Sequence, residues 1–158
     1  MDHRNLYRTA VFALSAIGSA AGHETGDYLV QRDCDAQRKQ ERTSTGRRSL
    51  AVHAGSYAAT QAATRAGIYR TAGLRVPATA QLAGTLVEGL IHAVIDDGRL
   101  LARFADTSGK RGFHDLAGHG INGRALMDQA AHKGLQIPLG AVVTTAVAAA
   151  LTRGRQQA

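Results

Sequence analysis

The stretch SLAVHAGSYAATQAAT, residues 49–64, indicates the fold class, because it is rich in alanine and contains no Asp, Glu, Lys or Arg. Alanine is the strongest helix former. The apolar residues do not alternate with the period of two that a half-buried strand requires. Three further stretches share this composition and lack of charge: Thr9–Gly22, Val76–Val87 and Gly134–Thr152. We therefore expect an all-α chain.

Charged and glycine-rich segments separate the four stretches and set the expected helix ends. Pro77 suits the first turn of the third helix, where a missing N–H costs nothing. Pro138 falls inside the fourth stretch, where proline kinks or restarts a helix, so the third or fourth helix could be broken. The number of helices and the size of the connectors predict an up-down-up-down four-helix bundle. The expected helices span about 8–31, 47–73, 77–104 and 122–152.

The chain has the size of one domain, with 158 residues of which 44% are apolar. We therefore expect a single helical domain over residues 1–158. Within it, the sequence predicts a charged connector over residues 32–48 and a glycine-rich connector over residues 105–124.

The charge balance favours anionic partners, since 19 Lys and Arg residues against 12 Asp and Glu residues give a net charge of +7. An anionic small molecule and a phospholipid surface both fit this balance. A nucleic acid fits less well, because only 4% of the residues are aromatic and no stacking platform is evident. The single cysteine, Cys34, excludes an internal disulfide and a CxxC zinc site.

Three His–Asp pairs carry the strongest chemical signal, because each pair is separated by four residues. Residues at positions i and i+4 share one helix face, so each pair places an imidazole beside a carboxylate. In an up-down-up-down bundle these pairs, together with a lone histidine in the second helix, fall at one end. Mixed nitrogen and oxygen ligands suit Zn²⁺, Fe²⁺ or Mn²⁺. The predicted ligands of such a divalent metal ion are His23, Asp27, His53, His92, Asp96, Asp128 and His132.

The order of these motifs resembles an uncharacterised family of small bacterial, mostly membrane-associated helical proteins, known only as a domain of unknown function. The resemblance covers roughly residues 10–150 and rests on short motifs: HETGDYLVQ with Lys39 downstream, VHAGSY, HAVIDD, GKRGF and MDQAAHK. By position it adds Gln31 and Lys39 to the polar set, as residues that support the ligands. Its pattern is loosely similar to that of membrane-bound metal-dependent hydrolases. Arg65 and Glu88 depart from it, since lipid-facing runs would be expected there.

Three functions stay open at this stage. The first is a metal-binding bundle that acts as a metal-dependent hydrolase, in which the ion activates water and Asp27 or Asp96 serves as general base. The second is a non-enzymatic basic module that binds nucleic acid or an anionic membrane surface. The third is a small structural membrane protein whose His/Asp network contains no metal.

The relation to a membrane is also open. Most of the apolar stretches are shorter than the about 20 residues that cross a bilayer, and only Gly134–Thr152 comes close. Twelve of the 19 Lys and Arg residues lie in segments 32–48 and 98–133, which the positive-inside rule would place in the cytoplasm. The first apolar run continues into a helical pattern without a cleavage site. We expect a cytoplasmic or cytoplasmic-membrane-associated protein that is not secreted.

Overall fold

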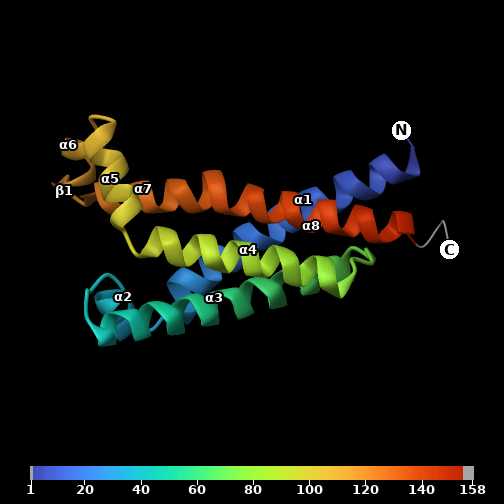
Figure 1. The fold of residues 1–158 in the computed structure, drawn as a ribbon, viewed down its shortest axis with the longest axis horizontal. Helices are drawn as coiled ribbons and strands as arrows, with labels where there is room; N and C mark the ends of the chain where they lie inside the picture. Colours follow the sequence, from blue (N-terminus) through green and yellow to red (C-terminus); the bar gives the residue numbers. More distant parts are fainter. Residues whose placement is uncertain (1, 155–158) are drawn as a thin grey trace.

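The computed structural model describes residues 2–154, and nearly all of them are helical (Figure 1). The prediction of an all-α chain is confirmed. Besides turns and loops, the described residues include two short strands that form one hairpin. In chain order the elements are α1 (His3–Thr25), η1 (Gly26–Val30), α2 (Asp33–Arg38), α3 (Ser44–Thr71), α4 (Ala78–Asp96), α5 (Arg99–Thr107), α6 (Arg111–His114), β1 (Ala117–Gly118), β2 (Ile121–Asn122), α7 (Gly123–Ala131), η2 (His132–Gln136) and α8 (Ile137–Gly154).

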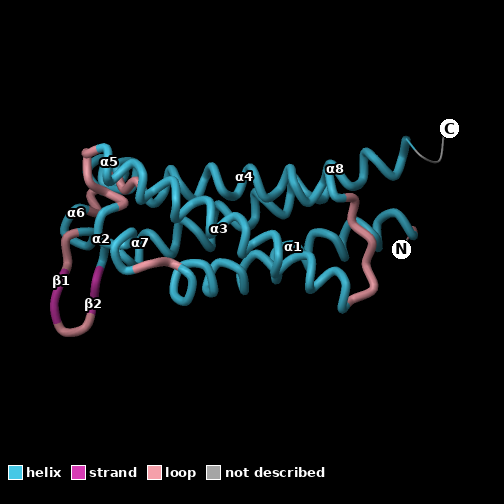
Figure 2. The backbone as a smooth tube through the Cα atoms, turned by 90° about the horizontal axis from the view of Figure 1, so that it is seen from below, coloured by secondary structure: helices cyan, strands magenta, loops and turns pink. Residues whose placement is uncertain are grey.

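The long helices lie side by side along the length of the molecule. α1 packs against α3 and α8, and α4 packs against the same two helices. Figures 1 and 2 show α2, α5, α6 and the hairpin gathered at one end, which we call the connector end. The start of α1 and the end of α8 lie at the opposite end, which we call the terminal end. Two helical runs, Ala78–Asp96 and Gly123–Arg153, are long and apolar enough to cross a membrane.

Local sequence signals explain where the helices begin and end. The side chains of Asp2, Thr43 and Asn122 cap α1, α3 and α7 by accepting a hydrogen bond from a backbone N–H in the first turn. Gly98 has a φ of +77° and separates α4 from α5. The helix expected over residues 77–104 is therefore interrupted at this glycine.

The two predicted connectors contain structure of their own. The charged segment 32–48 includes α2 and the start of α3. The glycine-rich segment 105–124 includes the end of α5, α6 and the hairpin, in which Ala117 pairs with Asn122 and Gly118 with Ile121. Both segments fold over the connector end of the molecule (Figure 2).

Two π-helical segments interrupt the long helices near the connector end. η1 follows α1 directly and carries Asp27, and η2 joins α7 to α8 and carries His132. η2 ends just before Pro138, whose missing N–H disturbs the regular helical hydrogen-bond ladder. Single-turn π segments of this kind are frequent at functional sites.

The interior is unusually polar. Among the described residues, 16 polar or charged residues are buried, compared with 11 hydrophobic ones. The apolar cluster around Val11, Tyr69 and Ala148 is confined to the terminal end. The outer surface is correspondingly apolar, and α4 alone exposes Leu82, Leu86, Leu90 and Val94 at four-residue intervals. Polar side chains therefore face inward and large apolar ones face outward.

The buried positions recur every four residues along each long helix, so the polar residues share one face with two buried tyrosines and a glycine. On α3 this face consists of His53, Tyr57, Gln61, Arg65 and Tyr69. Matching series on the other helices are Ser15, Ser19 and His23 on α1, Glu88, His92 and Asp96 on α4, and His132, Gln136, Gly140 and Thr144 on η2 and α8.

Arg65 and Glu88 form an ion pair in the middle of the interior. Arg65 Nη1 donates to Glu88 Oε1 at 3.0 Å, and Ser19 Oγ donates to the two carboxylate oxygens at 2.8 and 3.1 Å. Arg65 Nη2 also donates to Thr85 Oγ1. The two charged residues therefore face each other and lie away from the outer surface.

Candidate metal centre

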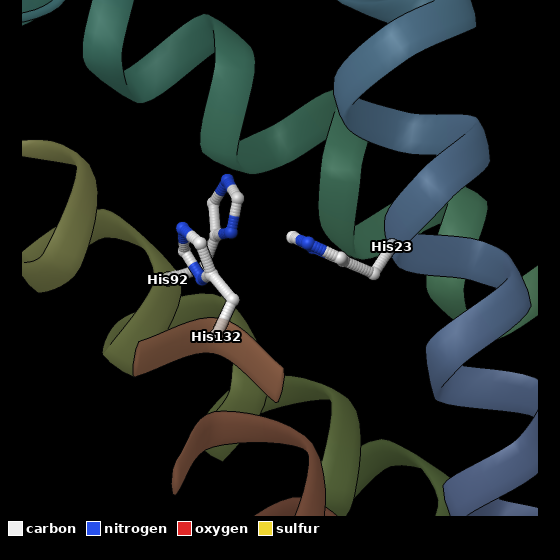
Figure 3. A group of neighbouring side chains, drawn as sticks. All are labelled: His23, His92 and His132. Carbon is white, nitrogen blue, oxygen red and sulfur yellow. The ribbon is translucent and has the colours of Figure 1, made fainter. Parts of the chain in front are cut away.

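Four histidines from four different helical segments meet near the connector end. His23 comes from α1, His53 from α3, His92 from α4 and His132 from η2, and each is at most 1% exposed. The ring centroid of His132 lies 4.9 Å from that of His23 and 4.6 Å from that of His92. Figure 3 shows the rings of His23, His92 and His132 pointing into the space between their helices. Helices far apart in sequence thus converge on one buried centre.

The three aspartates of the predicted pairs lie in the same centre. Three sets of residues have ligand atoms within 4.8 Å of one another and could hold a metal ion. The sets are His23, His92 and His132; Asp27, His53 and His92; and Asp96, Asp128 and His132. The structure therefore brings all seven predicted ligands together, and their binding of a metal stays a prediction.

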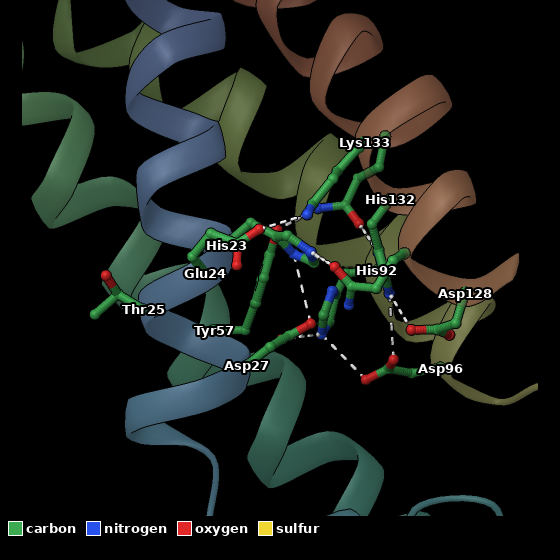
Figure 4. Close-up of polar contacts among 12 residues, drawn as sticks. His23, Glu24, Thr25, Asp27, Tyr57, His92, Asp96, Asp128, His132 and Lys133 are labelled. Atoms are coloured by element: carbon green, nitrogen blue, oxygen red, sulfur yellow. Dashed lines mark hydrogen bonds and ion pairs between the residues drawn. The ribbon is translucent and has the colours of Figure 1, made fainter. Parts of the chain in front are cut away.

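Asp96 belongs to the third set and also contacts two histidines of the second set. Its Oδ2 atom is 2.8 Å from His53 Nε2 and 3.1 Å from His92 Nε2. Its Oδ1 atom is 3.4 Å from His132 Nε2, which in turn lies 3.4 Å from Asp128 Oδ2 (Figure 4). The two oxygens of one carboxylate therefore face two different groups of ligands.

Asp27 lies close to His53 and His92, the histidines of the second set, and also to His23. Its Oδ1 atom lies 3.5 Å from His53 Nε2 and 3.7 Å from His92 Nε2, and its Oδ2 atom lies 3.5 Å from His23 Nδ1. Ligand atoms placed tetrahedrally at about 2.1 Å from an ion are separated by about 3.4 Å. The spacing of Asp27 from the two imidazoles therefore matches a coordination shell.

Two glutamines fix the proton positions of two histidines. His23 Nε2 lies 2.9 Å from Gln129 Oε1, and His132 Nδ1 contacts Gln136 Oε1. An amide oxygen only accepts, so the imidazole nitrogen must donate. In a neutral ring the other nitrogen then carries a lone pair. In both rings this second nitrogen faces a carboxylate, which requires either a proton on the nitrogen or a cation between the two groups. For His132, burial lowers the pKa, but hydrogen bonds to Asp128 and Asp96 outweigh burial and raise the pKa to about 10, so this ring is protonated when no ion is bound.

Several buried polar atoms of the centre have no hydrogen-bond partner within the described residues. They are His23 Nδ1, His53 Nδ1, His92 Nδ1 and Asp27 Oδ1. Each unpaired buried group costs about 1–3 kcal/mol. A bound cation would satisfy Asp27 Oδ1 and His23 Nδ1 directly, so the donor set fits a metal ion.

Tyr57 supports the centre from α3. Its ring stacks on His92 with centroids 3.5 Å apart and planes 11° apart. Its hydroxyl accepts hydrogen bonds from Gln61 Nε2 and Gln136 Nε2, both at 2.6 Å. Because Gln136 also holds His132, one network orients two of the histidines.

Four supporting residues are not among those predicted from the sequence: Tyr57, Gln61, Gln129 and Gln136. A signal was present for two of them, since Tyr57 follows His53 and Gln136 follows His132 by four residues. Such spacing places each on the same helix face as its histidine.

Lys39 and Gln31, predicted as supporting residues, do lie beside the centre. Lys39 Nζ donates to Asp96 Oδ2 at 2.9 Å. Gln31, with its amide oriented to satisfy both neighbours, donates to the Asp27 carbonyl at 3.3 Å and accepts from Lys39 at 3.2 Å. Both residues therefore connect Asp27 with Asp96 from the connector side.

No known protein family, no curated protein and no solved structure matches this chain. The resemblance to a family of membrane-associated helical proteins therefore stays a prediction.

Proposed function

We propose that this chain binds divalent transition-metal ions in its His/Asp centre and uses them for hydrolysis. One observation carries the proposal: Gln129 and Gln136 orient His23 and His132 so that the second ring nitrogen of each faces a carboxylate. Zn²⁺, Fe²⁺ and Mn²⁺ all accept such mixed nitrogen and oxygen ligands.

The position of Asp96 supports a centre with two ions. Asp27, His53 and His92 would hold one ion with Asp96 Oδ2, and Asp128 and His132 would hold the other with Asp96 Oδ1. Pairs of ions about 3.5–4 Å apart are common in hydrolytic enzymes. His23 lies within ligand distance of His92 and His132 and would complete the shell.

Ions in such a centre supply Lewis acidity and lower the pKa of water. In this arrangement Asp27 and Asp96 act as ligands, because their oxygens face the imidazoles. Asp128 would be a ligand through Oδ2, which faces His132, and its Oδ1 atom is the better placed general base, since 20% of the side chain is exposed. Lys39 would hold Asp96 in position by donating a hydrogen bond to its Oδ2 atom, whereas the Oδ1 atom of Asp96 faces His132.

Metal analysis of the full chain, purified without chelator, tests this proposal. We expect two ions per chain in the wild type, and about one after His53→Ala or His132→Ala. His3→Ala is the matched control, because His3 is exposed at the terminal end. One ion in the wild type would overturn the bridged pair, and none would overturn the whole proposal.

We further propose that the bundle spans a membrane, and an uncharged belt around its middle supports this. The belt comprises residues 9–23, 49–69, 76–96 and 134–152. Its only Asp, Glu, Lys or Arg residues are Arg65, Glu88 and Asp96, which are all buried. Each segment contains 15 to 21 residues, or roughly 22–31 Å of helix, compared with a hydrocarbon core of about 30 Å.

In this proposal the four long helices form an up-down-up-down four-helix bundle that crosses the bilayer four times. The basic segments 32–48 and 98–133 then share the connector end, which the positive-inside rule assigns to the cytoplasm. The metal centre lies at the border of the belt on this side. The interior Arg65–Glu88 pair is compatible with lipid, because charged groups inside a membrane face the bundle interior and pair with one another.

Cys34 provides a direct test of this topology, because it is the single cysteine and lies exposed in α2 at the connector end. A membrane-impermeant maleimide should label it only after the cells are permeabilised. Asn5→Cys in a Cys34→Ser background is the matched control, since position 5 is exposed at the terminal end and lies outside the belt. It should react in intact cells. Release of the protein without detergent would contradict a spanning bundle.

A metal-free His/Asp network that holds membrane helices together is the second candidate. The hydrogen bonds among Asp96, His53 and Lys39 favour it, because they join α2, α3 and α4 without an ion. It requires charged imidazoles at His23 and His132, so that both ring nitrogens donate. Full thermal stability after complete removal of metal would support this candidate against the metal centre.

A further inference from the structure

A basic cleft at the connector end adjoins the metal centre. It has a volume of about 830 Å³ and lies between the end of α2, the α4–α5 turn, α5, α6 and the start of α7. Asp128 and Lys39 line this cleft and also contact the centre, through His132 and Asp96 respectively. The cleft is therefore the natural approach for a substrate.

Cations outnumber carboxylates on the walls of the cleft. Asp97 forms ion pairs with two of them, Arg42 and Arg99. Burial alone would raise the pKa of Asp97, but hydrogen bonds from these two arginines outweigh it and hold the pKa below its usual value. Arg111 is paired with Asp106 and Asp115.

Two arginines of the cleft, Arg103 and Arg124, have no ion pair and no side-chain hydrogen bond among residues 2–154. Both are exposed, and they approach from different helices, α5 and α7. A guanidinium group presents a planar fork of donors that matches phosphate oxygens. Among the described residues, the cleft thus offers two guanidinium groups without ion pairs, and both lie in the cleft that adjoins the candidate metal centre.

We propose that this cleft binds a phosphate ester, with Arg103 and Arg124 holding the phosphate group. The inference rests on the proposed metal-dependent hydrolysis and names its substrate class. In the reaction the oxygen of water bonds to phosphorus, and the ester oxygen leaves with the electron pair of the broken P–O bond. One water proton ends on the leaving oxygen, which gives an alcohol, and the other stays with the released phosphate.

The phosphate can belong to a soluble ester or to a lipid headgroup, and the surroundings of the cleft bear on this choice. Phe104, Phe113 and Leu126 are about half exposed on α5, α6 and α7. Apolar side chains beside basic ones are typical of segments that lie in a membrane interface. In the proposed membrane topology, the connector end would present the cleft at the depth of lipid phosphates.

Calorimetric titration of the metal-loaded full chain in detergent tests the proposal with two probes, inorganic phosphate and short-chain phosphatidic acid in micelles. We expect saturable binding of a phosphate probe that is at least tenfold weaker in Arg103→Ala/Arg124→Ala, with unchanged metal content. Arg38→Ala/Lys110→Ala is the matched control, because it removes two exposed charges that do not line the cleft. It should bind both probes like the wild type.

The outcomes separate the cleft from the metal centre. Binding of both probes with similar affinity supports the phosphate group as the ligand, and much tighter binding of phosphatidic acid supports a lipid source. Equal binding by the two double variants overturns the cleft proposal, as does succinate binding as tight as phosphate. Absence of metal from a wild type that still binds phosphate through Arg103 and Arg124 overturns the proposed function and leaves the cleft as an anion site.

Discussion

Gly140 on α8 has no room for a side chain, so Gly140→Ala should break the buried Arg65–Glu88 pair. A Cβ atom at position 140 would overlap the Oε1, Cγ and Cδ atoms of Glu88. Glu88 would have to move away from Arg65 Nη1, now at 3.0 Å, and from Ser19 Oγ, now at 2.8 and 3.1 Å. The guanidinium of Arg65 would then be buried without its carboxylate.

The expected cost follows from the size of these two effects. Overpacking alone costs about 1–3 kcal/mol, and removing one partner of a buried ion pair costs about 3–5 kcal/mol. We therefore expect Gly140→Ala to lower the free energy of unfolding by about 3 kcal/mol or more. For a chain of this size, 3 kcal/mol corresponds to a fall in Tm of roughly 6–12 °C.

Thermal unfolding of the purified variants measures this effect. Gly134→Ala, six residues earlier in η2, is the matched control, because no atom lies within 4 Å of the added Cβ. Since alanine is favoured over glycine inside a helix by about 0.5–1 kcal/mol, this control should keep or slightly raise Tm.

A double-mutant cycle shows whether the clash with Glu88 is the cause. In a Glu88→Ala background the three nearest atoms to the new Cβ are gone, so adding Gly140→Ala should cost almost nothing. An equal fall in Tm in both backgrounds would refute the reasoning, because the damage would then arise elsewhere.

Three further predictions concern the network, a helix cap and the ions. Tyr57→Phe removes the acceptor for the amides of Gln61 and Gln136. It should lower the free energy of unfolding by about 1–3 kcal/mol per unpaired group. An unchanged Tm and metal content would contradict this prediction. Thr43→Ala removes the cap on Gly46 N and should cost about 1 kcal/mol in a denaturation experiment, whereas exposed Thr45→Ala should be nearly neutral. Removing metal with a chelator should lower Tm, because an ion that binds only the folded state stabilises it; re-addition of Zn²⁺ or Mn²⁺ should restore Tm.

The location of the candidate centre could be predicted from the sequence because it depends on local helix geometry. The i,i+4 spacing of His23 and Asp27, and of His92 and Asp96, places both members of each pair on one face whatever the tertiary structure. The predicted up-down-up-down order of the helices would then bring such faces to one end. Neither step requires knowledge of which side chains pack together.

The supporting contacts and the helix break depend on information that a single sequence does not carry. Glutamines such as Gln129 are common on exposed helix faces, and nothing in the residues next to Gln129 marks it as the partner of His23 on a distant helix. Whether Arg65 meets Glu88 depends on how far α3 and α4 are shifted along their axes relative to each other, and only packing determines this shift. Gly98 lies among residues with helical preference, and its positive φ ends α4 two residues earlier.

The four-residue recurrence of polar groups inside the molecule restricts how its helices can slide past one another. If α4 shifted by one turn relative to α3, Glu88 would lie level with Gln61 or Tyr69, and Arg65 would lose its only carboxylate among the described residues. An apolar interior would tolerate such a slip, because one methyl group replaces another. In this interior, the buried side chain on each turn of a helix meets a chemically distinct partner. Inserting four residues into α4 should therefore destabilise the fold as much as inserting one.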